Sequence, residues 1–349
     1  MSLSDAIKNE LESGKLPDLN RGRIVIRDAA YYLSDRPAIE YVVEKLVAEG
    51  SVNVWFGQWG AKKTWAAIDL AVCVASGKQW LGMATEPCNV LIIDEESGDT
   101  RLANRIKDVM RGELGEMADA SVPIKSVSLA QFNLLKNSDD ADLLTRLVLE
   151  LDAKLIIIDA LADVMLGGDE NAVKDTQPVF ANLRFIAELT GAAFIVIHHA
   201  NKGGGYRGST AIAGAIDTLL SVESKQDDGL ITFKTEKMRD GEPLNFACEA
   251  NWTDEGFYLT QSEITEKAFL SKSQRFALDF FTEHGDSTLK ELADWAGELY
   301  AYDTLKKAVL HLINEKLLER KDDGGRRVEA TYGLKVGIVT GKQIGRAHV

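Results

Sequence analysis

The sequence predicts an α/β protein with a mostly parallel sheet and a smaller C-terminal unit. Its 349 residues are 45% hydrophobic, which suits one large core and a second module. Between residues 51 and 262, apolar strand-like runs alternate with amphipathic helical patterns, as in β–α–β units. From residue 266 to 335 the pattern changes to short helices, so a second domain is predicted there.

Residues 1–50 are predicted to form an N-terminal arm that leads into the core. They contain a charged amphipathic helix at 5–12, a polar connector at 16–23 and a helical pattern over 38–48 that ends at Gly50. We therefore expect the α/β core to span 51–262.

The most informative segment is VNVWFGQWGAKKTW, residues 52–65, which predicts a buried strand, a glycine-containing loop and a helix over 64–76. This is the layout of a phosphate-binding loop. Its glycines let backbone N–H groups surround phosphate oxygens, its last lysine reaches the outer phosphates, and the next hydroxyl coordinates Mg²⁺. The helix directs its positive end at the anion. The predicted nucleotide contacts are Gly57, Gly60, Ala61, Lys62, Lys63, Thr64 and Trp65.

The loop departs from the usual pattern at Lys62, where a glycine is expected before the lysine and threonine. A side chain at this position must tolerate the backbone geometry that glycine ordinarily supplies. The alternative interpretation is an ordinary strand-turn-helix with two solvated lysines.

Three further predicted strands end in polar residues. Strand 89–93 leads into Asp94-Glu95-Glu96, strand 155–158 into Asp159, and strand 192–197 into His198-His199. In an open parallel sheet, ligands collect outside the carboxyl ends of the strands, so these side chains should converge on the phosphates. Asp159 is predicted to hold Mg²⁺ together with Thr64.

Helices over 99–111, 139–151 and 176–190, the last closed by Gly191, should separate these strands. The segments LLSVES and LITFKTEK then flank KQDDG, which predicts a hairpin. Lys237 and Arg239 are placed just past the end of its second strand.

Residues 266–335 predict three helices, at 271–281, 288–296 and 302–314, and then a strand-turn-strand. This is the outline of a winged helix-turn-helix. Its basic residues that would meet DNA phosphate include Lys306, Lys307, Arg326 and Arg327. Basic and acidic residues are nearly balanced, so protein docking is the alternative. Residues 336–349 form a tail without a periodic pattern.

Charge and cysteine content narrow the function classes. A net charge of −14 argues against a surface that coats DNA generally, though not against local binding. Cys73, Cys88 and Cys248 occur singly, which indicates neither a disulfide framework nor a zinc site. Without a signal peptide or a long apolar run, we expect a soluble cytoplasmic protein with no membrane partner.

From about residue 38 to 240 the chain resembles the RecA-like ATPase core of hexameric replicative helicases, of the plasmid RepA type and more distantly the DnaB type. The resemblance rests on VWFGQWGAKKTW, VLIIDEES, LIIIDALAD, FIVIHHANKGGGYRGST and EKMRD, in that order. It implies an ATP- and Mg²⁺-dependent helicase or translocase that acts on single-stranded DNA as a homo-hexamer. Plasmid, phage or mobile-element replication is the implied setting, with a primase or replication initiator as a further partner.

The resemblance also implies roles for single residues in hydrolysis. Glu96 corresponds to the carboxylate that activates the attacking water, with Glu95 as the competing residue. Either acid could instead stabilise the N-terminus of the following helix. His199 corresponds to the residue that senses the γ-phosphate, and a plain core histidine is its alternative. Its neighbour His198 should point to the opposite face of the sheet.

Other residues are assigned to a neighbouring subunit or to DNA by the same resemblance. Arg239, with Lys237, corresponds to a cationic finger that enters the neighbour's site, although solvated strand-end charges are the commoner case. The glycine-rich loop after the histidines offers contacts to single-stranded DNA. These are Lys202, Tyr206 and Arg207, the last also a reserve finger.

Two other functions remain open at this point. One is a RecA-like recombination or repair ATPase that forms filaments on DNA. The other is a DNA-binding regulator that senses nucleotide through a weakened phosphate loop.

Overall fold

The structure is a computed structural model that describes residues 28–34, 38–135, 138–200, 214–224, 229–262, 270–322 and 330–335. The chain divides into two compact units, Met1–Glu263 and Ile264–Val349. None of the helices in the described ranges is long and apolar enough to cross a membrane.

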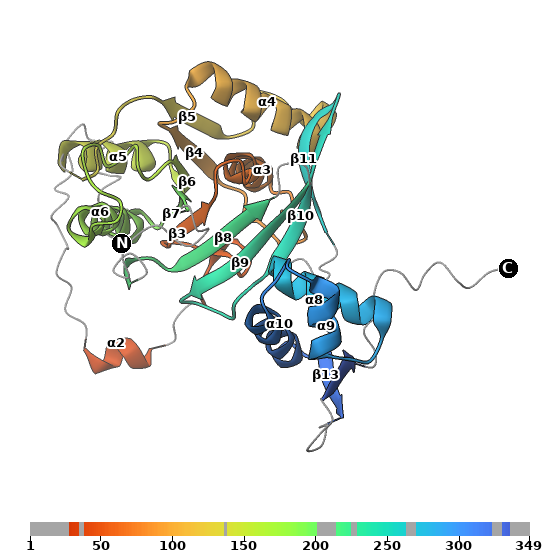
Figure 1. Ribbon diagram of the computed structural model, residues 1–349. Coiled ribbons are helices and arrows are strands. Elements are labelled where there is room, and N and C mark those ends of the chain that lie inside the picture. The colour runs from red at the N-terminus through yellow and green to blue at the C-terminus, as the bar shows by residue number, and fades with distance from the viewer. Residues whose placement is uncertain are drawn as a thin grey trace. The chain divides into compact units, whose positions relative to one another are not determined.

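The first unit is built on a nine-stranded sheet with the strand order β11-β10-β9-β8-β3-β7-β6-β4-β5 (Figure 1). The six strands from β8 to β5 in this order are parallel, and β9, β10 and β11 continue the sheet antiparallel. The predicted α/β fold with a mostly parallel sheet is therefore confirmed. The strands are β3 Val52–Gly57, β4 Asn89–Asp94, β5 Ile124–Ser128, β6 Ala153–Asp159, β7 Ala193–His199, β8 Thr218–Ser224, β9 Leu230–Met238, β10 Phe246–Thr253 and β11 Gly256–Gln261.

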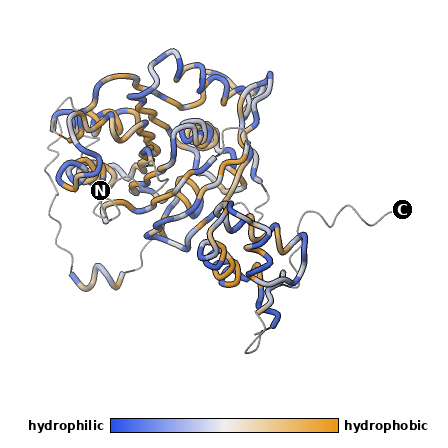
Figure 2. The backbone as a smooth tube through the Cα atoms, in the orientation of Figure 1, coloured by the Kyte–Doolittle hydropathy of each residue, from blue (hydrophilic) through white to orange (hydrophobic). Residues whose placement is uncertain are grey.

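The central strands are buried on both faces because helices cover both sides of the sheet. Trp55 of β3 packs into a core with the helices α3 and α4, whereas its neighbour Val54 packs on the other face with α5 and α6. Figure 2 shows hydrophobic stretches along these strands. The helices are α3 Lys63–Ser76, α4 Asp99–Leu114, α5 Ser138–Glu150 and α6 Val173–Thr190.

These four helices lie where the sequence predicted them. The helix α6 ends as predicted, with Gly191 at a φ of 72°, in the left-handed region that glycine adopts readily. The predicted hairpin is also present, as the antiparallel pair β8 and β9.

The helical pattern predicted over 38–48 is wrong. This segment forms a hairpin of β1 Tyr41–Val43 and β2 Val47–Ala48, preceded by the short helix α2 Ala29–Leu33. Its valines are β-branched and favour strands, and Lys45 turns the chain with a φ of 59°. Apolar spacing alone could not distinguish a helix from a hairpin here, because both structures place the same residues in the core. The helix predicted at 5–12 lies outside the described residues.

In its described residues, the second unit has three helices and a three-stranded antiparallel sheet ordered β12-β14-β13. The helices agree with the predicted ones. Ser271 and Thr288 each form a capping box at the start of a helix, which explains where α8 and α9 begin. The elements are α8 Lys272–His284, β12 Ser287–Thr288, α9 Leu289–Ala296, α10 Tyr302–Asn314, β13 Leu318–Asp322 and β14 Thr331–Leu334.

Candidate active site

The loop between β3 and α3 needs its two glycines for different reasons. A Cβ added to Gly57 would lie 2.1 Å from the carbonyl oxygen of Val222 on β8, so glycine permits close approach of that strand. A Cβ added to Gly60 would meet no atom within 4 Å, but the φ of Gly60, 76°, lies in the left-handed region. Together they shape the turn that brings the loop to the N-terminus of α3.

Lys62 adopts the conformation that the expected glycine would adopt. Its φ is 62° and its ψ 22°, at the N-cap position of α3. This left-handed conformation costs a residue other than glycine about 1 kcal/mol. The loop therefore keeps a glycine-like backbone in spite of the lysine side chain.

Lys63 and Thr64 follow and meet the end of β6. The residue Lys63 is only 5% exposed, and its ammonium donates to the carbonyl oxygens of Gly57 (2.9 Å) and Gln58 (3.0 Å). Burial lowers the pKa of Lys63, and the nearby carboxylate of Asp159 offsets part of this effect. Thr64 Oγ1 donates to Asp159 Oδ2 at 2.6 Å.

Asp159 has the environment of a cation ligand. Burial raises its pKa to about 6, opposed by the Thr64 hydroxyl and increased by the nearby Glu96 carboxylate. Its other oxygen, Oδ1, is buried and accepts no hydrogen bond from the described residues. A carboxylate oxygen without a donor beside a hydroxyl oxygen fits Mg²⁺, which prefers oxygen ligands. The two predicted metal residues therefore lie together and suit that ion.

Replacing Asp159 with asparagine should stabilise the protein at pH 8 when neither nucleotide nor Mg²⁺ is present. The folded protein keeps the Asp159 proton up to about pH 6, whereas the usual pKa is 3.8. Protonation thus stabilises the fold below pH 4, and this stabilisation is lost as the pH rises through 6. Because one pKa unit is worth about 1.4 kcal/mol, the gain at pH 8 is about 3 kcal/mol at most.

Thermal unfolding of both proteins between pH 4 and pH 8 checks this expectation. The difference in Tm should be largest at pH 8 and should vanish near pH 4. A difference that does not change with pH would contradict the high pKa of Asp159.

The three acidic residues at the end of β4 have different surroundings. Asp94 accepts hydrogen bonds from the backbone N–H groups of Ser97 (3.1 Å) and Gly98 (2.9 Å), just before α4. Glu95 accepts from the backbone N–H groups of Gln131 (2.9 Å) and Phe132 (3.3 Å) and so holds a neighbouring loop. Glu96 lines a cavity together with Lys63, Thr64 and Asp159.

The two histidines at the end of β7 point in opposite directions, as alternation in a strand requires. His198 is buried, with Nδ1 3.8 Å from Glu170 Oε2. His199 lines the cavity, its ring centre 5.1 Å from that of Trp59 and its Nε2 3.6 Å from Glu96 Oε2. Burial and the charge of Lys63 lower the pKa of His199, so its ring is neutral at pH 7.

The cavity encloses about 300 Å³ beside the phosphate loop. Four of its lining residues were not among the predicted site residues: Trp59, Arg105 on α4, Ile197 and Trp252 on β10. The guanidinium of Arg105 lies 5.8 Å from the ring centre of Trp65, and its Nη1 donates to Ser97 Oγ at 2.7 Å. Such planar groups suit a nucleotide base. The lining residues are Trp59, Gly60, Ala61, Lys62, Lys63, Thr64, Trp65, Glu96, Arg105, Asp159, Ile197, His199 and Trp252.

Lys237 and Arg239 lie at the opposite end of the sheet from this cavity. Arg239 pairs with Asp217 at 2.9 Å, and Asp217 also accepts a hydrogen bond from the backbone of Val52, the first residue of β3. Lys237 donates to the carbonyl oxygen of Ile216 at 2.6 Å. The phosphate loop follows the last residue of β3, roughly 17 Å away at the usual rise per residue. Neither cation lies in the cavity of its own chain.

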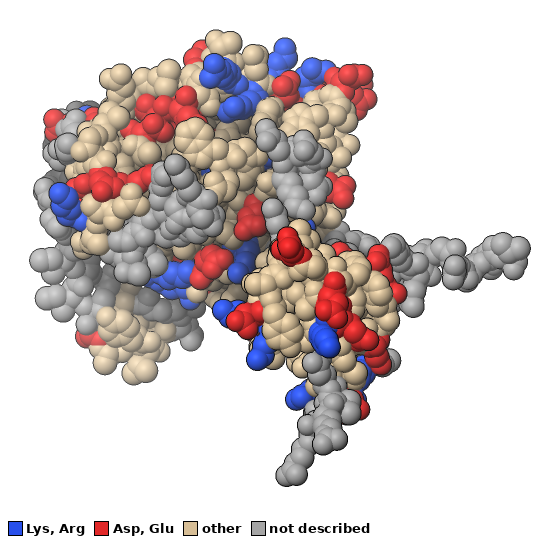
Figure 3. Space-filling view, in the orientation of Figure 1, with Lys and Arg blue, Asp and Glu red and all other residues tan. Residues whose placement is uncertain are grey.

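The predicted DNA contacts are only partly described. Lys306 and Lys307 are exposed on α10. The other predicted contacts lie outside the described residues: Lys202, Tyr206, Arg207, Arg326 and Arg327. On the face in Figure 3, basic and acidic side chains are interspersed.

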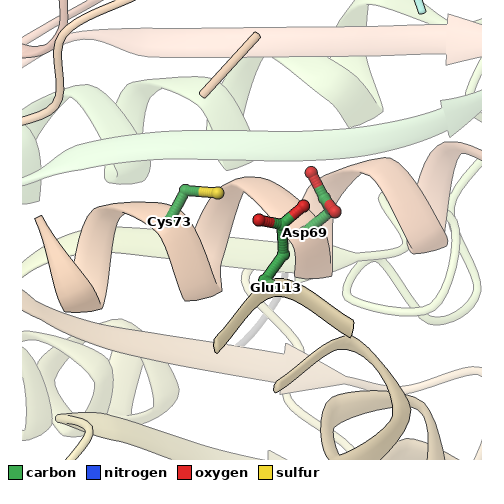
Figure 4. Close-up of side chains that lie close together, drawn as sticks. All are labelled: Asp69, Cys73 and Glu113. Atoms are coloured by element: carbon green, nitrogen blue, oxygen red, sulfur yellow. The ribbon is translucent and has the colours of Figure 1, made fainter. Parts of the chain in front are cut away.

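A second group of ionisable side chains lies further along α3. Asp69, Cys73 and Glu113 place their oxygen and sulfur atoms within 4.8 Å of one another, and Figure 4 shows the two carboxyl groups facing each other. Burial and the charge of Glu113 raise the pKa of Asp69 well above its usual value. Trp80 Nε1 and the backbone N–H of Leu259 donate to Asp69, and Lys78 pairs with Glu113. These contacts explain the group as a buried network joining α3 to α4.

A protein family matches the part of the chain that carries the phosphate loop. A family model described as "AAA domain" matches residues 21–205. Among solved structures, the KaiC-like protein PH0186 of the hyperthermophilic archaeon Pyrococcus horikoshii OT3 is similar, with 17% identity and a TM-score of 0.44 over 62% of this chain and 93% of that one. No curated protein matches. The family match, the parallel sheet and the phosphate loop support a RecA-like P-loop ATPase core. Because the family model covers more than half of the chain, the protein belongs to the AAA domain family.

Proposed function

We propose that the protein is an ATP-driven DNA helicase or translocase that works as a homo-hexamer on single-stranded DNA. The observation that carries the proposal is the cavity in which Lys63, Thr64, Glu96 and Asp159 meet. It combines a cation for the outer phosphates, two oxygen ligands for Mg²⁺ and a carboxylate for the attacking water. Phosphoryl transfer to water requires these three elements.

In the proposed reaction, Lys63 leaves the carbonyl oxygens that it contacts in the loop and pairs with the outer phosphates. Thr64 and Asp159 would hold Mg²⁺, which neutralises charge on the phosphates when bound. Glu96 orients a water and accepts its proton as the oxygen bonds to the γ-phosphorus and the bond to ADP breaks. His199, 3.6 Å from Glu96, is proposed to sense whether the γ-phosphate is present.

The position of Arg239 supports the homo-oligomer in this proposal. Arg239 lies near the start of β3, so it reaches a phosphate only if a second subunit brings its cavity to that edge. A cation supplied across a subunit boundary stabilises transition-state charge and makes hydrolysis depend on assembly. The salt bridge with Asp217 orients Arg239 at that edge.

Subunit mixing tests this assignment. Arg239→Ala and Glu96→Gln should each be nearly inactive, yet their equal mixture should recover turnover. About a quarter of the interfaces in mixed rings combine an intact Arg239 with an intact Glu96. Recovery should fade on dilution, because assembly obeys mass action.

The matched control mixes Lys63→Ala with Glu96→Gln. Both changes damage the same cavity of one chain, so this mixture should stay inactive. Two results would contradict the role of Arg239 in a neighbouring site: a monomer with full activity, or a mixture that recovers no turnover although its subunits exchange. Either result would favour a site complete within one chain.

The DNA-binding part of the proposal draws on the basic residues of the glycine-rich loop and of the second unit, proposed here as a winged helix. Plasmid, phage or mobile-element replication, with a primase or initiator as partner, is the proposed setting. The test is steady-state ATP hydrolysis by the intact chain with and without single-stranded DNA, together with displacement of a strand from a forked duplex. Both stimulation and displacement are expected. Absent turnover with sequence-selective duplex binding would point to the nucleotide-sensing regulator instead.

A further inference from the structure

We infer that Lys62 is a positioning residue that ties the phosphate loop to Ser224 and Trp252 and thereby sets how tightly the cavity holds a nucleoside triphosphate. The inference rests on the proposed function and extends it to a residue at which the loop departs from its usual pattern.

The backbone gives the first reason. Lys62 holds a left-handed conformation, with a φ of 62°, that glycine would adopt without strain. A strained residue persists only where the surrounding structure holds it in place, and such residues concentrate at functional sites. The side chain of Lys62 is therefore the place to look for a compensating interaction.

Its contacts supply that interaction. Lys62 Nζ donates to Ser224 Oγ at 2.5 Å, at the last residue of β8. The same ammonium lies 5.9 Å from the ring centre of Trp252 on β10, within the range of a cation–π interaction. One side chain of the phosphate loop thus contacts two strands that carry no part of the loop.

These contacts place Lys62 between the phosphate end of the cavity and its aromatic wall. Trp252 is 52% exposed and rests edge-on against Trp65, with 6.2 Å between their ring centres. Its ring centre also lies 4.9 Å from that of Phe257, yet half of the side chain stays exposed, so the contact from Lys62 adds to the few rings that fix its position. Holding Trp252 in place lowers the entropy lost when a base stacks on it.

The two lysines of the loop therefore have separate tasks. Lys63 is buried and directed at the loop carbonyls, where the outer phosphates would lie. Lys62 is directed the other way, at Ser224 and Trp252. Substitution of the Lys62 side chain should therefore weaken binding of the nucleotide more than it slows hydrolysis.

Three substitutions in the full chain test whether Lys62 positions the cavity or whether the loop only tolerates a lysine in a strained conformation. Lys62→Gly should raise the Tm without nucleotide, because the backbone relaxes, yet weaken ATP binding about tenfold. Tenfold corresponds to about 1.4 kcal/mol, close to the lower end of what a hydrogen bond from a charged donor contributes. Lys62→Met should weaken ATP binding similarly without raising the Tm, and Lys62→Arg should keep binding within about threefold.

Calorimetric titration with ATP and ADP gives the dissociation constants, and steady-state kinetics should show the loss in KM rather than kcat. Ser224→Ala should also weaken binding, and its combination with Lys62→Met should add little, because both remove one contact. Lys107→Met, at an exposed lysine of α4, should change neither Tm nor affinity.

The outcomes also separate this inference from the proposed function. If Lys62→Gly gains stability and binds ATP as tightly as the wild type, Lys62 is only tolerated and the inference is overturned alone. Failure of the wild-type protein to bind ATP or ADP would overturn the proposed function and the inference with it.

Discussion

Replacing Lys63 with alanine should reduce ATP turnover by at least about 100-fold, the usual cost of removing one preorganised charge-stabilising group. Lys63 is 5% exposed and its ammonium lies against the loop carbonyl of Gly57, so its charge acts where water screens charge poorly. Arg105 also lines the cavity, but it contacts Trp65 and Ser97 on the aromatic side. No other cation among the described lining residues is directed at the loop carbonyls.

Lys62→Ala and Lys107→Ala are the matched controls, measured by the same steady-state assay. The first should lower affinity for ATP, and the second should have no effect. A mild effect of Lys63→Ala beside a complete loss in Lys62→Ala would mean that the two lysines exchange roles. Circular dichroism of each variant should show an unchanged fold.

The sequence predicted the arrangement of the site because parallel strands place their carboxyl ends on one edge. The apolar runs before Asp94, Asp159 and His198 are long enough to identify buried strands without any tertiary information. Once β3, β7, β6 and β4 are neighbours in one sheet, their polar ends must meet. The backbone conformation of Lys62 was predictable for a different reason. The phosphate-loop pattern expects a glycine at this position, and the lysine that replaces it keeps the glycine-like backbone.

Other parts of the site depend on contacts that sequence spacing does not encode. Arg105 lies on a helix with no motif, and Trp252 lies on a late antiparallel strand about 190 positions after the loop. The preference for Glu96 over Glu95 likewise depends on the loop that holds Gln131 and Phe132. The sequence pattern could limit the general base to two adjacent acids. Only the hydrogen bonds of the folded protein show that these two acids have different surroundings.

Glu96→Gln should retain nucleotide binding and lose hydrolysis by at least about 100-fold, in the range that general-base catalysis contributes. The amide keeps the size of the side chain but cannot take a proton from water. Binding should be unchanged or tighter, because a negative charge near the phosphates is removed. The same loss of charge lowers the pKa of Asp159, which favours the ionised carboxylate that would hold Mg²⁺.

Glu95→Gln provides a control of the same chemistry at the adjacent position. Glu95 accepts two backbone hydrogen bonds, so its amide should lower the Tm while leaving turnover within about tenfold of the wild type. Single-turnover hydrolysis and equilibrium binding of ATP, measured on both variants, separate chemistry from affinity. If Glu96→Gln loses binding and hydrolysis equally, Glu96 supports the shape of the cavity. If Glu95→Gln instead binds ATP without hydrolysing it, the base is Glu95, and the loop that holds it must open during turnover.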